Sequence, residues 1–259
     1  MKIAITGKGG VGKTTLSAIL SHLFARDGKT VIAVDADPDA NLAGALGISE
    51  KELDGIRPIA EMADLIEQRT GARPGSAGGI FKLNPKVDDI PDACSRNIDG
   101  IKLLVMGKSK EASSGCFCPE SVFLKHLLRH IVLNRDDVVI VDMEAGIEHL
   151  TRGTAAAVDF FIVVVEPGKR SIQTALAVRE LAKGLGVKEV FVVANKIREG
   201  ENITFIKDNI EDMKFIGSIS YNQDIINADM KGISPFGASQ ITVDEIKKIK
   251  DTLDNKLKD

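Results

Sequence analysis

The chain has 259 residues, and its 34 lysines and arginines nearly balance 37 aspartates and glutamates, which gives a formal net charge of −3. A chain without a strong positive charge is not expected to bind nucleic acid or an anionic membrane. Its longest apolar run, at residues 160–165, is far shorter than the roughly 20 residues that cross a bilayer, and its first residues suit a strand rather than a leader peptide. We therefore expect a cytoplasmic protein that has no nucleic acid and no membrane among its partners.

The first feature along the chain is a glycine-rich loop between a strand and a helix. The apolar run Lys2–Thr6 comes first, GKGGVGKTT occupies Gly7–Thr15, and a helical segment follows. The loop matches G-x-x-x-x-G-K-[ST], a pattern in which backbone N–H groups surround a phosphate and the helix adds the positive end of its dipole. Lys13 is placed to reach the β- and γ-phosphates, and the Thr14 hydroxyl can ligate Mg²⁺. We assign nucleotide binding to Gly7, Gly9, Gly10, Val11, Gly12, Lys13, Thr14 and Thr15.

Beyond this loop, short apolar strands alternate with helical segments. The first helix is predicted to end at Asp27-Gly28, and Thr242 with Glu245 forms a predicted capping box for the last helix. Such alternation predicts one α/β domain over residues 1–259, a P-loop NTPase with a mainly parallel twisted sheet and helices on both faces. The predicted strands are 30–35, 101–106, 138–142, 160–165 and 190–195, and further helices are predicted at about 171–185 and 242–258.

Residues 49–115 interrupt this alternation. A short helix is predicted near residues 61–68, but residues 70–79 and 84–97 carry Pro, Gly and Asp at densities that suit loops. We interpret residues 49–115 as a loop-rich insertion in the same domain. It could carry partner contacts or be structural decoration, since loops often do either.

Acidic residues follow two of the predicted strands. Asp142 closes the strand at 138–142, so its carboxylate is expected beside the phosphate loop as the second Mg²⁺-linked group, and Gly146 is placed to bring its N–H to a γ-phosphate. Asp37 follows the strand at 30–35 and could orient the attacking water. The alternative for Asp37 is an Asx-rich turn with solvated acids.

Asn195 and Lys196 close a later strand and resemble the base-reading stretch of nucleotide-binding proteins. Guanine readers carry an acid two residues after the lysine, and this chain has Arg198 there. We therefore prefer adenine, and hence ATP or ADP, as the nucleotide. The alternative is an asparagine that only ends a strand.

The loop Lys8–Thr14 resembles the deviant Walker A loop of the MinD, ParA and nitrogenase iron-protein class, and the residue that carries the likeness is Lys8. The resemblance implies a Mg²⁺-dependent ATP hydrolase in which Lys8 reaches across an ATP-bound homodimer to the partner's phosphates. It also implies that Asp37 orients water, that residues 142–148 form a switch, and that Asn195 and residues 219–235 hold adenine. Lys8, Lys13 and Asp37 are then the catalytic residues.

Two cysteines, Cys116 and Cys118, stand directly before a helix that is predicted to begin at Pro119. Thiolates are soft ligands for Ni²⁺, Zn²⁺ or Cu⁺, but two do not complete a four-coordinate site. His126 and His130 would lie roughly 10 and 16 Å along the helix, too far to complete it. A second copy related by a two-fold axis would supply the missing pair. A redox thiol pair and structural cysteines are the alternatives, and Cys94 is interpreted as incidental.

The C-x-C element, together with residues 142–155, is similar to the CooC-type maturation ATPases of carbon-monoxide dehydrogenase. That similarity implies nickel delivery to an active-site cluster, coupled to ATP hydrolysis, with acetyl-CoA synthase as an alternative client. Two rival hypotheses remain: a ParA- or MinD-like ATPase that positions DNA or acts at a membrane, and an iron-protein-like Fe–S reductase. A membrane role would need a free apolar helix, but we expect the C-terminal helix, with Ile246, Ile249, Leu253 and Leu257 on one face, to dock on the sheet.

Overall fold

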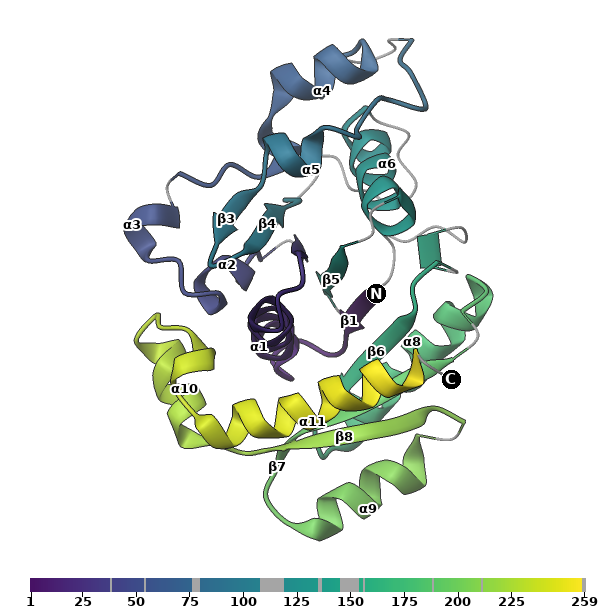
Figure 1. Cartoon of the computed structure of the whole chain (residues 1–259). Helices are drawn as coiled ribbons and strands as arrows, with labels where there is room; N and C mark the ends of the chain where they lie inside the picture. Colours follow the sequence, from purple (N-terminus) through teal and green to yellow (C-terminus); the bar gives the residue numbers. More distant parts are fainter. Residues whose placement is uncertain are drawn as a thin grey trace.

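The chain folds around a central, mainly parallel β-sheet (Figure 1). The computed structural model describes residues 1–37, 39–53, 55–75, 80–107, 119–134, 137–144, 154–155, 157–187, 189–210 and 212–257. These residues form an eight-stranded sheet in the order β3-β4-β2-β5-β1-β6-β7-β8. The strands are β1 (Lys2–Thr6), β2 (Val31–Ala36), β3 (Arg96–Ile98), β4 (Ile101–Val105), β5 (Val138–Met143), β6 (Phe160–Val165), β7 (Val190–Ile197) and β8 (Lys214–Ser220).

Side-chain alternation along the strands divides the core into two apolar layers. Ile3 and Ile5 of β1 pack into one layer, and Ala4 between them packs into the other. This follows from the two-residue period of a strand, which sends successive side chains to opposite faces. All residues of β2, β5 and β6 are buried, as expected for parallel strands that are covered by helices on both faces.

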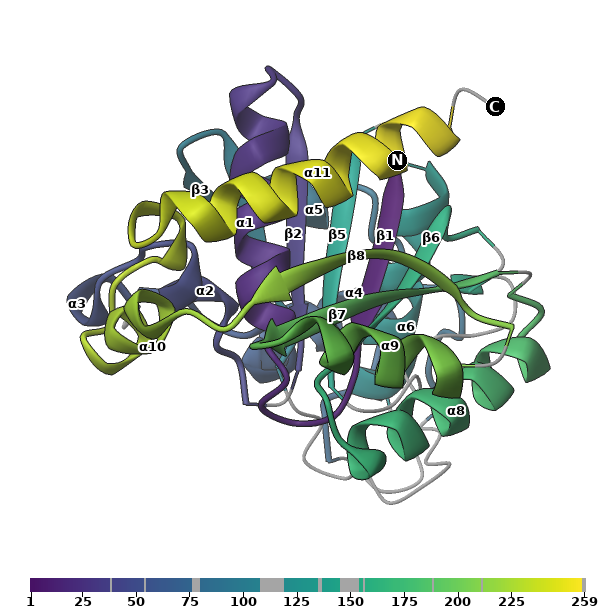
Figure 2. The same cartoon turned by 90° about the horizontal axis from the view of Figure 1, so that it is seen from below.

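Helices cover both faces, and Figure 2 shows α1 and α11 in front of the strands. This side holds α1 (Lys13–Arg26), α2 (Leu42–Ala45) and α11 (Gln240–Lys256), with α10 (Gln223–Met230) and η2 (Pro235–Gly237) beside them. The opposite layer contains η1 (Ile59–Glu61), α4 (Ala63–Thr70), α5 (Ile90–Ala93), α6 (Pro119–Asn134), α8 (Lys169–Gly184) and α9 (Gly200–Asn209). The α/β fold class predicted from the sequence is confirmed. Among the described residues, none of the helices is both long and apolar enough to cross a membrane.

The C-terminal helix α11 docks on the sheet, as predicted. Ile246, Ile249 and Leu253 are buried in the layer below it, whereas Leu257 is 48% exposed at its end. The predicted Thr242–Glu245 capping box is wrong. The N-cap is Ser239, whose side chain accepts from the backbone N–H of Thr242, and Glu245 instead accepts hydrogen bonds from the backbone N–H and hydroxyl of Ser220. A contact between helix and strand has replaced a local one.

The described part of residues 49–115 combines loops with short elements, including α3 (Glu50–Leu53), α4 and α5. Its last strand, β4, pairs in parallel with β2, and β3 pairs with β4 in the antiparallel sense. Asp99 and Gly100 join β3 to β4 with φ values of 47° and 87°. A two-residue turn of this kind returns the chain at once, so β3 can only be an antiparallel edge strand.

Candidate functional site

The glycine-rich loop lies at the carboxyl end of β1, and its glycines are required by their surroundings. Gly7 has φ +147°, and a Cβ there would collide with the carbonyl oxygen of Val164 on β6. Gly12 has φ +97°, and a Cβ there would collide with the side-chain amide of Asn195. Helix α1 begins at the next residue, Lys13. Its free N–H groups and positive dipole end therefore face the loop, which is an arrangement suited to phosphate.

Asn195 and Lys196, at the end of β7, hold this loop from one side. The side-chain amide of Asn195 donates to the carbonyl oxygen of Val11 at 2.7 Å, and the Lys196 ammonium donates to that of Gly10 at 2.6 Å. Lys196 adopts φ +57°, which is uncommon for a residue other than glycine. The structure thus brings both predicted base-site residues against the phosphate loop.

Asp142 lies beside the beginning of α1, as the sequence predicted. Its Oδ1 accepts from the Ser17 hydroxyl at 3.2 Å. Burial raises the pKa of Asp142 to about 6, while the Thr14 hydroxyl, the Lys13 ammonium and the Ser17 hydroxyl limit the increase. Its Oδ2 is buried and has no hydrogen-bond partner among the described residues. A carboxylate oxygen without a partner, next to the Thr14 hydroxyl, is the donor set that a hydrated Mg²⁺ uses.

Asp35, which the sequence analysis did not assign to the site, is fully buried directly opposite Asp142 in the β2–β5 register. It accepts from the backbone N–H groups of Leu42 at 2.9 Å and Asp37 at 3.3 Å. Burial raises the pKa of Asp35 to about 7, its backbone hydrogen bonds oppose the increase, and the nearby charge of Asp142 adds to it. Asp37 is half-buried next to this pair. The sequence does contain a feature that could have indicated Asp35: like Asp142, it stands at the end of an apolar strand.

Glu166, directly after β6, is a second residue that sequence reasoning missed. Its carboxylate lies 3.7 Å from the Lys8 ammonium and 3.2 Å from the Lys196 ammonium. Like Asp142, it is an acid that closes an apolar strand beside β1. This position at the end of a strand could have indicated from the sequence that Glu166 belongs to the site.

Three predicted residues, Cys116, Cys118 and Gly146, lie outside the described residues. In the part of the chain that the structure describes, no group of three His, Cys, Asp or Glu residues could hold a metal ion. Helix α6 begins at Pro119, as predicted. His126 and His130 on α6 are half-buried, and burial lowers the pKa of His126.

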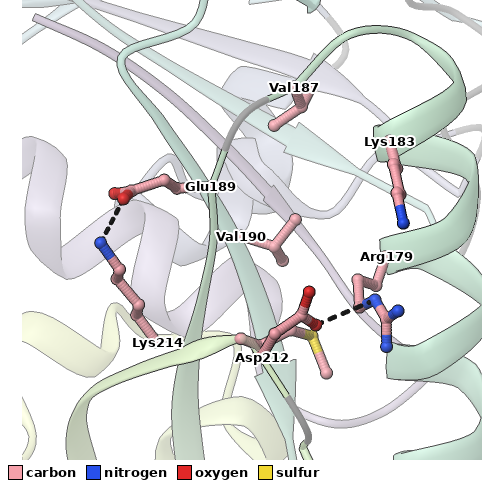
Figure 3. Close-up of a pocket in the computed structure, with 8 residues that line it drawn as sticks. Arg179, Lys183, Val187, Glu189, Val190, Asp212 and Lys214 are labelled. Carbon is pink, nitrogen blue, oxygen red and sulfur yellow. Dashed lines mark hydrogen bonds and ion pairs between the residues drawn. The ribbon is translucent and has the colours of Figure 1, made fainter.

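A separate cavity of about 210 Å³ lies at the amino ends of β7 and β8 (Figure 3). Its lining includes two ion pairs, Glu189 with Lys214 and Arg179 with Asp212. The phosphate loop lies at the other edge of the sheet, where the parallel strands end.

The model of the CobQ/CobB/MinD/ParA nucleotide binding domain matches residues 2–236. The chain is 46% identical over 239 residues to the carbon monoxide dehydrogenase accessory protein CooC of Rhodospirillum rubrum, covering 92% of this chain and 90% of CooC. It is also 46% identical over 252 residues to an uncharacterized ATP-binding protein of Methanocaldococcus jannaschii, with 96% of each chain covered. MinD of Pyrococcus horikoshii complexed with Mg-ADP has the same fold, with a TM-score of 0.68 at 18% identity over 99% of this chain and 97% of that structure.

The chain therefore belongs to the CobQ/CobB/MinD/ParA family of nucleotide-binding domains, and it is an ATPase. Within that class it is of the CooC type, which confirms the resemblance found in the sequence.

Proposed function

We propose that this ATPase is an accessory protein of carbon-monoxide dehydrogenase and that it delivers nickel to the active-site cluster of that enzyme. The observation that carries the proposal is the 46% identity to CooC across 92% of this chain, because CooC is named as such an accessory protein. In this proposal nickel is the cargo, and ATP hydrolysis drives its delivery.

In the nucleotide site, Lys13 binds the β- and γ-phosphates and Gly146 meets the γ-phosphate. Thr14 and Asp142 would hold Mg²⁺, which would neutralise negative charge on the phosphates. The buried Oδ2 of Asp142, which lacks a hydrogen-bond partner among the described residues, supports this role. Asp37 orients the attacking water.

The remaining nucleotide contacts come from the loop and from the end of β7. Gly7, Gly9, Gly10, Val11, Gly12 and Thr15 surround the phosphates with the first turn of α1, and Asn195 and Lys196 lie on the adenine side. Lys8 crosses to the phosphates of a second copy, so that ATP brings two copies into a homodimer. An added cation of this kind is worth about 10³–10⁵ in rate in other phosphoryl-transfer systems.

The cargo site uses Cys116 and Cys118 of both copies. Four thiolates satisfy a four-coordinate soft cation, either Ni²⁺ or Zn²⁺, and a two-fold axis brings the same residues of both chains together. Hydrolysis of ATP then separates the copies and releases the metal. The partners in this proposal are the second copy and the client enzyme, with no nucleic acid and no membrane.

The test combines metal analysis with solution mass, with and without a non-hydrolysable ATP analogue. We expect a dimer with one bound Ni²⁺ per two chains when the analogue is present. A nucleotide-bound monomer would contradict the shared site. Binding to DNA or to liposomes would favour the positioning ATPases, and a brown chromophore after anaerobic purification would favour an Fe–S reductase.

A further inference from the structure

One carboxylate connects two parts of the phosphate loop. Oε1 of Glu166 lies 3.7 Å from the Nζ of Lys8, and Oε2 of Glu166 accepts a hydrogen bond from the Nζ of Lys196 at 3.2 Å. The same Lys196 ammonium donates to the carbonyl oxygen of Gly10 at 2.6 Å. Glu166 therefore contacts Lys8 directly and reaches Gly10 through Lys196.

The sheet brings these residues together. Strand β6 lies between β1 and β7, so the residues at the carboxyl ends of these three parallel strands meet at one edge of the sheet. The backbone N–H of Glu166 donates to the buried Ser171 hydroxyl at 3.1 Å, which fixes where its side chain begins. On the other side, the Asn195 amide anchors the loop through Val11.

We propose that Glu166 is a positioning residue: it retains Lys8 on its own subunit until ATP binds, and it keeps Lys196 on the Gly10 carbonyl. This inference rests on the proposed function, in which Lys8 contacts the phosphates of a second copy. The side chains of Lys8 and Glu166 are 40% and 27% exposed, so their ion pair is accessible and readily exchanged. When Lys8 leaves, Lys196 still neutralises Glu166, and the carboxylate keeps a counter-ion.

The first experiment measures dimer formation against the concentration of a non-hydrolysable ATP analogue. In Glu166→Gln, Lys8 is no longer retained, and the half-saturating concentration falls roughly two- to fivefold, the range for an exposed ion pair. In Lys196→Met, Glu166 has Lys8 as its remaining cation, and the concentration does not fall. Glu189→Gln is the matched control, because it removes a carboxylate paired with Lys214 at the far edge of the sheet (Figure 3), and it should behave like the unmodified protein.

The second experiment needs no second copy. Amide hydrogen exchange of residues 7–12 is measured in the nucleotide-free protein, where both Glu166→Gln and Lys196→Met weaken the contact to Gly10. Exchange should become several-fold faster in both variants and remain unchanged in Glu189→Gln.

The two measurements separate the possible failures. If the unmodified protein dimerises and Glu166→Gln needs as much nucleotide or more, the retention of Lys8 is overturned. If exchange in the loop is unchanged, the contact through Lys196 is overturned. A protein that binds nucleotide and never dimerises overturns the homodimer of the proposed function together with the retention of Lys8, and the exchange result then decides the Lys196 contact alone.

Discussion

Asp35 and Asp142 place two carboxyl groups at adjacent strand ends where almost no water reaches them. Asp35 is 0% exposed and Asp142 is 1% exposed. The Asp142 group has two hydroxyls and the Lys13 ammonium beside it, whereas Asp35 accepts from two backbone N–H groups. Neutral donors compensate a buried negative charge less fully than a cation does, and the pKa of Asp35 is accordingly raised further, to about 7, against about 6 for Asp142.

This difference predicts how stability changes with pH. The pKa of Asp35 is about 7 in the folded chain, against an ordinary value of 3.8 for an aspartate. Between these values the folded state holds a proton that the unfolded state releases, so this group lowers stability as the pH rises. In Asp35→Asn that loss is absent. The free energy of unfolding of the variant, relative to the unmodified protein, should therefore improve by about 2–3 kcal/mol from about pH 5 to about pH 8.

Urea denaturation of the nucleotide-free protein at both pH values measures this change. Asp39→Asn is the control, because Asp39 is an exposed acid four residues away, and it should leave the pH dependence unaltered. Parallel pH dependence of Asp35→Asn and the unmodified protein would show that Asp35 does not titrate in this range.

Lys13 gives a second prediction for a single residue. It is only 6% exposed at the beginning of α1, and in the proposed function its ammonium binds the phosphates. Lys13→Met should weaken nucleotide binding about 10- to 100-fold, because a charge-assisted contact is lost. Titration with a fluorescent ATP analogue measures the affinity. Lys183→Met, in the cavity at the far edge, should leave the affinity unchanged, and an equal loss in both variants would contradict the site.

At the scale of the elements, the contact between α11 and β8 depends on a glycine. A Cβ on Gly217 of β8 would lie 2.6 Å from Cγ1 of Ile249 on α11. Since Ile249 is 1% exposed, it has no room to move away. Gly217→Ala should therefore destabilise the protein by about 1–3 kcal/mol through overpacking.

The matched experiment is a double-mutant cycle measured by urea denaturation. Ile249→Ala alone should cost about 2–5 kcal/mol because it leaves a cavity. In Gly217→Ala with Ile249→Ala, the new methyl group occupies part of that space, so the combined loss should be smaller than the sum of the single losses. A strictly additive result would mean that Gly217 is required by its backbone rather than by Ile249.

The elements that could be predicted from the sequence are those whose signals are local. The phosphate loop and β6 were predicted because a short motif or an apolar run defines each. The α11 cap was wrong because Glu245 is used in a contact with Ser220, 25 residues away in the sequence. Strand β8 could not be predicted from the sequence, since Gly217 interrupts its apolar pattern.

The residues of the candidate site also divide into those that a local pattern predicts and those that depend on the order of the strands. Lys13, Thr14 and Asp142 could be placed from motif and strand end, because each lies within or beside a recognisable pattern. The contacts of Glu166 with Lys8 and Lys196 require the order β1-β6-β7, and nothing in a single sequence specifies which strands are neighbours. The burial of Asp35 likewise depends on the pairing of β2 with β5.

At the scale of the whole molecule, the topology relates helix α6 to the nucleotide site. Helix α6 joins β4 to β5, two strands that are both parallel to β2. A crossover helix runs back along its sheet, so α6 begins at the carboxyl edge, where Lys13 and Asp142 lie. Cys116 and Cys118 precede α6 directly in the sequence. The amino end of α6 and the nucleotide site therefore lie at the same edge of the sheet.

This connection predicts reciprocal coupling between nucleotide and metal. If ATP closes a dimer that shares thiolates, a non-hydrolysable ATP analogue should tighten Ni²⁺ binding by about 5- to 150-fold, and Ni²⁺ must tighten binding of the analogue by the same factor. Calorimetric titrations in both orders measure the two factors. In Cys116→Ser with Cys118→Ser, nucleotide binding should persist while Ni²⁺ binding and the coupling are lost. Cys94→Ser alters a half-buried free thiol, and this variant should change neither the Ni²⁺ binding nor the coupling. Equal Ni²⁺ affinities with and without the analogue would show that the nucleotide site and the metal site are not coupled, and ATP hydrolysis could then not drive release of the metal.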